Sequence, residues 1–216
     1  GDAALYCDFG KEVNREINNN VINYFTNIKQ KQITGITNLT PSYNKLIISF
    51  DLNVTSYSKI RKIIENLEIK NLNDVSKKIV EIPICCENNF KLDHERLEKK
   101  LGIKFDKILE IFFGNEYFCY MTGFIAGMPF LGDINEKLRA KRLNTPRVKV
   151  PKGSIGLTEQ FCNIYTYESP GGWNIIGNTP LEIFKKENEK NPLFINPGDI
   201  VKFKQITKDE YDKIKT

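Results

Sequence analysis

Apolar positions in the first 85 residues follow two spacings, one typical of helices and one typical of strands. In residues 11–31 and 57–67 they recur at steps of three and four, which predicts two amphipathic helices. Four short apolar runs have the length of strands, and they are residues 3–9, 33–40, 44–50 and 79–85. The resulting order, β-α-β-β-α-β, is that of a ferredoxin-like domain, in which both helices cover one face of a four-stranded sheet.

The pattern changes after residue 80. Two short helices are expected, one carrying Leu97 and one over residues 105–113, and each is followed by a glycine. From residue 116 onward, strand-like runs alternate with Gly- and Pro-rich segments, which is typical of a small β-barrel or sandwich. Thr207 and Glu210 fit a capping box that opens a short C-terminal helix. We therefore expect an α+β protein with an α/β domain over residues 1–80 and a β-barrel domain over residues 81–216.

Turn-forming residues are densest between residues 147 and 180, which hold five of the 14 glycines and the only tryptophan. Such density marks sharp corners between strands. The most distinctive string is SPGGW, residues 169–173, for which two interpretations are open. Its backbone N–H groups could form an anion-binding nest, or it could be a β-turn whose Trp173 plugs one end of the barrel.

Two charged positions are candidates for chemistry, and each has an ordinary structural alternative. Arg147 could hold a carboxylate or a phosphate with two hydrogen bonds, or it could pair with a nearby Asp or Glu. His94 is the only histidine, and the carboxylates of Asp93 and Glu95 flank it at the start of a predicted helix. It is either a surface residue or a general acid or base. No Ser-His-Asp or Cys-His arrangement is possible without it.

The segment GFIAGMPFLG, residues 123–132, is apolar and rich in glycine. It could be an exposed binding loop, because large apolar patches on soluble proteins often mark partners. It could also be a buried crossover strand. We expect a mixture, with Met128, Pro129 and Phe130 in a wall or an interface.

Composition excludes several classes of function. The net charge of +5 comes from scattered lysines, so the sequence does not predict nucleic-acid binding. No apolar run approaches the roughly 20 residues that span a bilayer, so no membrane association is predicted. Five cysteines without a C-x-x-C pair, beside one histidine, do not predict a metal site. Free thiols suit a reducing compartment, so we expect a cytoplasmic protein.

Several spaced motifs resemble one family along essentially the whole chain. They are GDxAL with FG near the start, GFIAGMPFLG, TPRVKVPKGSIG, ESPGGWNIIGNTP and NPGDIVKF, in this order. Together they are similar to the family of the 5-oxoprolinase B subunit, whose members are also called allophanate hydrolase subunit 1 or Kip-type histidine kinase inhibitors and consist of carboxyltransferase subdomains C and D. This resemblance implies an N-terminal α/β domain and a C-terminal cyclophilin-like β-barrel.

The resemblance also implies partners. Members of this family typically act beside a homologous C subunit, as in the carboxyltransferase part of urea amidolyase. With an A subunit they form an ATP-dependent enzyme that opens the lactam of 5-oxoproline to glutamate. A branch of the family instead binds a histidine kinase and blocks its autophosphorylation. The chain itself has no Walker loop, so ATP is expected to be used by the complex.

Departures from the family pattern concentrate at polar loop positions. The family's Gln-Thr-Gly is replaced by Phe161, Cys162 and Asn163, and its Gly-Arg-Thr-Pro has Asn178 in place of the arginine. Further replacements fall at residues 86–89, 126, 128, 130 and 158–159. The retained residues are mostly Gly, Pro, Trp and apolar residues, which give a barrel its shape. This pattern fits a divergent member whose catalysis is weakened or directed to another ligand.

From this resemblance we expect a subunit of a 5-oxoprolinase-type, ATP-dependent hydrolase that opens lactams or amides. Arg147 would bind a substrate carboxylate or a carboxyphosphate, and Thr179 would be a secondary polar contact. The SPGGW segment would shape an anion pocket through Ser169, Gly171, Gly172 and Trp173. The alternative is a regulatory protein that inhibits the autophosphorylation of a histidine kinase through an apolar barrel surface.

Overall fold

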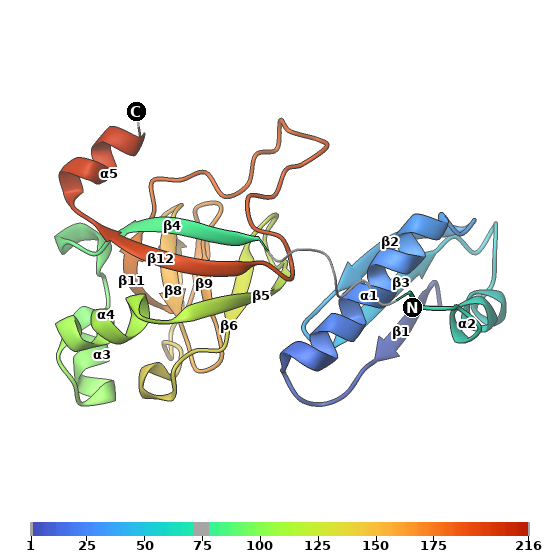
Figure 1. Ribbon diagram of the computed structural model, residues 1–216, viewed down its shortest axis with the longest axis horizontal. Coiled ribbons are helices and arrows are strands. Elements are labelled where there is room, and N and C mark those ends of the chain that lie inside the picture. Colours follow the sequence, from blue (N-terminus) through green and yellow to red (C-terminus); the bar gives the residue numbers. More distant parts are fainter. Residues whose placement is uncertain (1, 71–77, 216) are drawn as a thin grey trace. The chain divides into compact units, whose positions relative to one another are not determined.

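The computed structural model describes residues 2–70 and 78–215. Contacts within the chain divide it into two compact units, Gly1–Ser76 and Lys77–Thr216 (Figure 1). The first unit combines helices with a sheet, and the second is built around a closed β-barrel. The protein is therefore α+β, as the sequence predicts.

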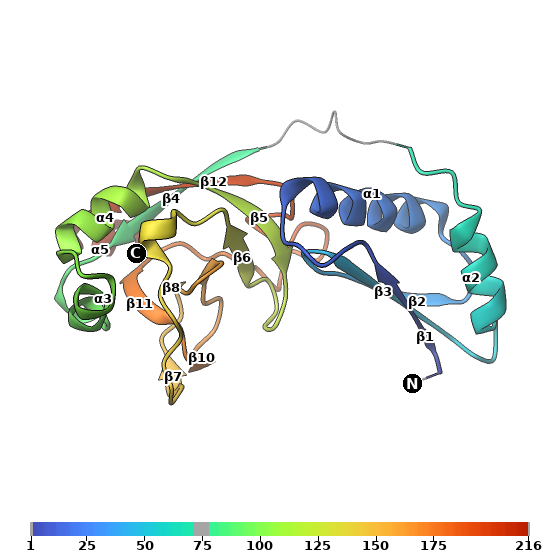
Figure 2. The same cartoon turned by 90° about the horizontal axis from the view of Figure 1, so that it is seen from below.

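The first unit is a three-stranded antiparallel sheet in the order β1-β3-β2, with two helices on one face (Figure 2). Apolar residues of both helices share one core with inward residues of the strands. Tyr6 and Ile47 pair across β1 and β3 and are exposed on the other face. The elements are β1 (Ala4–Asp8), α1 (Arg15–Lys31), β2 (Ile36–Pro41), β3 (Lys45–Phe50) and α2 (Tyr57–Glu65).

The prediction of a four-stranded ferredoxin-like sheet is wrong about the fourth strand. Strand β4 (Ile79–Cys85) instead runs parallel to β12 (Ile200–Ile206) over seven residue pairs and belongs to the barrel. Hydrophobic alternation identifies a strand but not its partner, and here the partner is more than 100 residues away in the sequence. The expected boundary after residue 80 would fall inside β4.

The second unit is a closed seven-stranded barrel in the order β11-β4-β12-β5-β6-β9-β8. Its inward side chains form one large apolar core. Two further strands, β7 and β10, form a separate two-stranded sheet within the part of the chain that the structure describes, and we call them the β7–β10 ribbon. Besides β4 and β12, the strands are β5 (Glu116–Thr122), β6 (Pro129–Gly132), β7 (Arg147–Val150), β8 (Ser154–Leu157), β9 (Cys162–Ile164), β10 (Ser169–Gly171) and β11 (Asn174–Asn178).

Three α-helices accompany the barrel, and they are α3 (His94–Leu101), α4 (Phe105–Phe113) and α5 (Lys208–Lys215). Two short 3₁₀ helices span Asn88–Phe90 and Glu136–Leu138. The predicted capping box opens α5: Thr207 N donates to Glu210 Oε2 (2.8 Å), and Glu210 N donates to Thr207 Oγ1 (3.3 Å). Among the described residues, no helix has the length and hydrophobicity to cross a bilayer.

The five cysteines carry free thiols, and all but Cys7 are buried. Cys85, the last residue of β4, and its neighbour Cys86 lie in different apolar clusters. Burial raises the pKa of the Cys86 thiol to about 12, so it remains protonated at neutral pH.

Phe112 and Phe113 on α4 provide a test of the barrel core. Phe112 is fully buried and stacks on Phe203, with 4.9 Å between ring centroids, whereas Phe113 is only partly buried. We predict that Phe112→Ala lowers the free energy of unfolding by about 3–5 kcal/mol, because it leaves a cavity. Phe113→Ala is the matched control and should cost clearly less. Chemical denaturation measures both, and equal losses would contradict this packing.

Candidate functional site

A cavity of about 370 Å³ lies in the second unit and contains most of the SPGGW segment. Ten of its eleven lining residues have apolar, amide or phenolic side chains or are glycines, and the remaining one is an arginine. The lining residues are Phe124, Met128, Phe130, Arg142, Pro146, Asn163, Tyr165, Pro170, Gly171, Gly172 and Trp173. We call this space the outer-wall cavity.

The floor of the cavity is part of the outer face of the barrel, where Phe130 of β6 and Asn163 of β9 line it. Phe130, Asn163, Gly156 and Ile175 form one row of paired residues across β6, β9, β8 and β11. Their neighbours along each strand, such as Leu131, point the other way into the barrel core. The row therefore faces away from the core, where it forms a second apolar cluster with Met128, Val150 and Tyr165.

The β7–β10 ribbon carries the SPGG residues to this face. Gly171 pairs with Arg147 across the ribbon, and a Cβ at Gly171 would lie 2.2 Å from Tyr165 Oη. The residue must be glycine because the tyrosine hydroxyl lies against its backbone. Neither Gly171 nor Gly172 has a positive φ, so neither has the left-handed backbone of an αR-αL anion nest.

Trp173 lies at the end of this segment, where its ring meets that of Phe130 edge to face. The centroids are 5.6 Å apart and the planes make an angle of 85°. The indole therefore forms a cavity wall on the outside of the barrel, and it does not plug a barrel end.

Three polar side chains line the otherwise apolar cavity: Arg142, Asn163 and Tyr165. Arg142 is exposed, and no described residue pairs with its guanidinium. Burial raises the pKa of the Tyr165 hydroxyl, so this group is neutral at physiological pH. The outer-wall cavity thus combines neutral walls with one cation.

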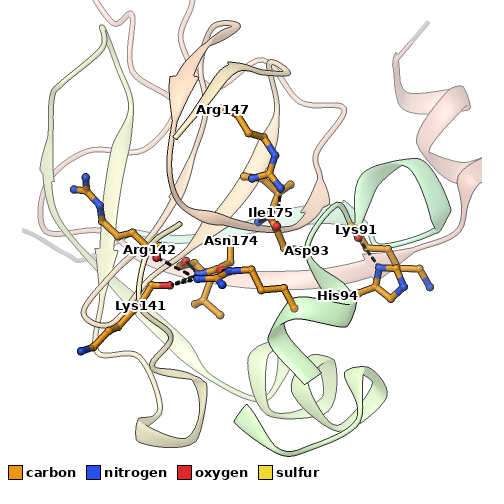
Figure 3. Close-up of polar contacts among 10 residues, drawn as sticks. Lys91, Asp93, His94, Lys141, Arg142, Arg147, Asn174 and Ile175 are labelled. Atoms are coloured by element: carbon orange, nitrogen blue, oxygen red, sulfur yellow. Dashed lines mark hydrogen bonds and ion pairs between the residues drawn. The ribbon is translucent and has the colours of Figure 1, made fainter. Parts of the chain in front are cut away.

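The carboxylate of Asp93 joins the ribbon to the barrel (Figure 3). Asp93 Oδ1 accepts a hydrogen bond from Arg147 Nη2 (2.6 Å), and Asp93 Oδ2 accepts one from the backbone N–H of Ile175 (2.7 Å). The backbone N–H of Asp93 donates to Ile175 O (3.1 Å). Asp93 is 5% exposed, so this ion pair is largely protected from solvent. The ion pair between Asp93 and Arg147 therefore fixes β7 against β11. Because β10 pairs with β7, it is held in place as well.

Arg96, one helical turn further along α3, holds a second side of the cavity. Its Nη2 donates to the carbonyl oxygens of Lys141 and Arg142 (3.1 Å each), and its Nε donates to Asn174 Oδ1 (2.9 Å). Asn174 Nδ2 in turn donates to Lys141 O (3.2 Å). The start of α3 therefore orients the backbone that carries Arg142.

The sequence-predicted site residues fall into three groups. Gly171, Gly172 and Trp173 line the outer-wall cavity. Arg147 pairs with Asp93, which is the alternative that the sequence left open, and the buried Ser169 Oγ has no hydrogen-bond partner among the described residues. Thr179 lies in a separate cavity of about 280 Å³ beside α5.

Two other predicted features take ordinary structural roles. The ring of His94 packs edge to face on Phe105, and its Nδ1 is 2.9 Å from Lys91 O, so it lies outside the outer-wall cavity. The segment 123–132 is the expected mixture. Phe124 is 79% exposed at the cavity, whereas Met128 is buried and Pro129 opens the wall strand β6.

Sequence reasoning missed Asp93, Arg96 and Arg142 as parts of the site. In the sequence Asp93 stands out only as a neighbour of His94, and its partners lie 54 and 82 positions away. The loss of an arginine at position 178 also drew attention to Asn178. That residue is buried and structural: its Oδ1 accepts from Tyr211 Oη (2.8 Å) and its Nδ2 donates to Lys152 O (2.9 Å).

Metal-binding groups do not cluster here. Across residues 2–70 and 78–215, no group of three or more His, Cys, Asp or Glu side chains could hold a metal ion.

Removing the Asp93 carboxylate tests the link between ribbon and barrel. We predict that Asp93→Ala lowers the free energy of unfolding by about 3 kcal/mol, because Arg147 loses its counter-ion in a partly buried place. The matched control is Glu182→Ala, which breaks the exposed pair with Lys152 (2.7 Å) and should cost less than about 1 kcal/mol. If urea denaturation shows that the two substitutions lower the free energy of unfolding equally, the buried pair contributes no more to stability than the exposed one.

The two adjacent glycines of SPGGW should respond differently to a methyl group. Gly171→Ala should cost about 1–3 kcal/mol by overpacking against Tyr165, and the added change Tyr165→Phe should restore part of the loss. Gly172→Ala should be tolerated, because its Cβ would come no closer than 3.5 Å to Pro146. Thermal denaturation of the three variants checks this order, and a larger loss at Gly172 would contradict it.

Comparison with known proteins identifies the family. Residues 1–195 match the family model of the carboxyltransferase domain, subdomain C and D. The B subunit of 5-oxoprolinase from Bacillus subtilis is 31% identical over 227 residues, which cover 100% of this chain and 94% of that protein.

Two solved structures are also similar. The crystal structure of a conserved uncharacterized protein, PH0987 from Pyrococcus horikoshii, is 33% identical with a TM-score of 0.60, and the match covers 98% of this chain and 97% of that one. The crystal structure of TTHA0988 is 25% identical with a TM-score of 0.83, and this chain spans 40% of its length. The match to the family model and the identity along the whole chain show that this protein belongs to the family of 5-oxoprolinase B subunits, which consist of carboxyltransferase subdomains C and D.

Proposed function

We propose that this chain is a non-autonomous subunit of an ATP-dependent hydrolase that opens the lactam or amide bond of a small acid, 5-oxoproline or a close analogue. The observation that carries the proposal is the outer-wall cavity, which combines apolar walls with Arg142, whose guanidinium has no hydrogen-bond or ion-pair partner among the described residues. A small ring with one carboxylate has the same combination of properties. The cavity volume of about 370 Å³ lies within the range of small-molecule sites.

Within this proposal the residues have separate tasks. The guanidinium of Arg142 binds the substrate carboxylate, since a planar fork of donors suits two carboxylate oxygens. Trp173 and Phe130 hold the ring between apolar surfaces and exclude water. Arg147 acts as a positioning residue: it is paired with Asp93 and fixes the ribbon that bears Gly171 and Gly172.

The proposal includes partners, because the cavity alone has no group placed to activate water or phosphate. A homologous C subunit would complete the active site, and an A subunit would complete the complex. ATP would be used by that complex. The barrel would be cyclophilin-like, and the five free thiols suit the cytoplasm.

A second candidate is the inhibition of a histidine kinase through an apolar surface. Phe124 and Val148 favour it, because they are 79% and 81% exposed. Binding to a kinase dimerisation domain with loss of autophosphorylation would support this function. The hydrolase function is the better supported of the two because single exposed apolar side chains are common on protein surfaces.

Reconstitution tests the proposed function directly. We predict that the chain, co-expressed with the C- and A-type subunits of its own organism, forms a complex that releases glutamate from 5-oxoproline only when ATP is present. Arg142→Gln should lower kcat/KM at least about tenfold, because the ligand loses a charged hydrogen bond of about 1.5–3 kcal/mol.

A neighbouring charge provides the control for this reconstitution. Lys141→Gln removes a cation whose side chain does not line the cavity, and it should leave turnover unchanged. A well-folded complex of all three subunits without turnover would refute the proposed function.

A further inference from the structure

Asn163 is the exception among the side chains that form the floor of the outer-wall cavity. It is 2% exposed and sits between Phe130 on β6 and Gly156 on β8. Its Nδ2 donates to Met128 Sδ at 3.3 Å, and its Oδ1 has no hydrogen-bond partner among the described residues. The Asn163 N–H group also hydrogen-bonds the hydroxyl of Tyr165. The carboxamide is thus buried on an apolar face with its oxygen unpartnered among the described residues.

This arrangement is unfavourable in the free protein. A buried acceptor without a partner costs about 1–3 kcal/mol, and a thioether sulfur is a weak acceptor for the N–H group. The large majority of buried polar side chains in proteins are hydrogen-bonded, so an unpaired one requires an explanation. Leucine has nearly the same size and would fit this apolar row without that cost.

The fold leaves room for the carboxamide. A Cβ at Gly156 would lie 2.4 Å from Asn163 Oδ1 and 3.0 Å from Trp173 Cβ. The amide oxygen therefore occupies the space that the missing side chain of Gly156 leaves, next to the indole that forms a cavity wall. Asn163 itself lines the cavity, and Arg142 lines it too.

We infer that Asn163 determines specificity by recognising the amide group of the ligand, an inference that rests on the proposed function of the outer-wall cavity. Asn163 Oδ1 accepts a hydrogen bond from the ligand N–H. Nδ2 leaves the sulfur of Met128 and donates to the ligand carbonyl oxygen. A rotation about Cβ–Cγ, which is soft in asparagine, turns the covered oxygen toward the ligand.

The class of ligand follows from the two hydrogen bonds to Asn163 and from the positive charge of Arg142. It is a compact molecule with a cis-amide, such as a lactam, and a carboxylate that reaches Arg142.

Two ligands of equal shape test the inference. They are 5-oxoproline and 3-oxocyclopentane-1-carboxylate, in which CH₂ replaces the ring N–H. Isothermal titration calorimetry should show that the wild-type chain binds the lactam at least about tenfold more tightly, because a buried acceptor rejects a ligand without a donor. Asn163→Leu should bind the two ligands equally.

Thermal denaturation separates this role from a structural one. Asn163→Leu should melt at the same temperature as wild type or higher, since it removes an unsatisfied amide oxygen. Asn178→Ala is the matched control: it deletes a fully bonded buried amide outside the cavity, and it should melt lower yet keep the preference for the lactam.

Several results would overturn the inference. Equal affinity of wild type for both ligands would do so, as would a preference that survives in Asn163→Leu or the absence of binding to either ligand. A reconstituted complex that still releases glutamate would leave the proposed function standing in each of these cases. Conversely, the chain could prefer the lactam in a way that depends on Asn163 while the reconstituted complex shows no turnover. That result would refute the hydrolase function and leave the role of Asn163 standing.

Discussion

The carboxylate of Asp93 is the contact on which the candidate site depends. One oxygen holds the backbone of β11 and the other holds Arg147 of the β7–β10 ribbon, which is not otherwise part of the barrel sheet. Charged hydrogen bonds in a protected place are stronger than neutral ones, so this side chain contributes strongly to the link between β7 and β11, beside the apolar packing of Val150 on Ile175. Arg96, close to Asp93 in the sequence, donates to the carbonyl oxygens of Lys141 and Arg142 and so fixes the segment that carries Arg142. The cavity walls are therefore set largely by residues that do not touch its interior.

Glycine positions complete this construction. Gly156 and Gly171 are close-approach glycines, where the carboxamide of Asn163 and the hydroxyl of Tyr165 lie against the backbone. A side chain at Gly156 would collide with Asn163, and one at Gly171 would collide with Tyr165. Gly171 of the SPGGW segment therefore contributes to the shape of the cavity, and Arg142, Asn163 and Tyr165 contribute its polar groups.

The sequence predicts the local elements well because each depends on nearby residues. Helix α4 has the expected bounds, and the capping box of Thr207 and Glu210 is present. Long-range pairing is not encoded in such patterns: the hydrophobic pattern of β4 suits the last strand of the first unit, yet the strand pairs with β12. The site was only partly predictable for the same reason. SPGGW was identified by its composition, whereas Asp93 gains its role from partners far away in the sequence.

An NMR titration tests most directly whether the outer-wall cavity binds a small acid. On addition of 5-oxoproline, we predict that the largest shifts occur at the backbone N–H groups of Gly171 and Gly172 and at the indole N–H of Trp173. Resonances around Thr179 should remain unchanged, because Thr179 lines a different cavity. Shifts confined to Thr179 and α5, or no shifts at all at saturating ligand, would contradict binding in the outer-wall cavity.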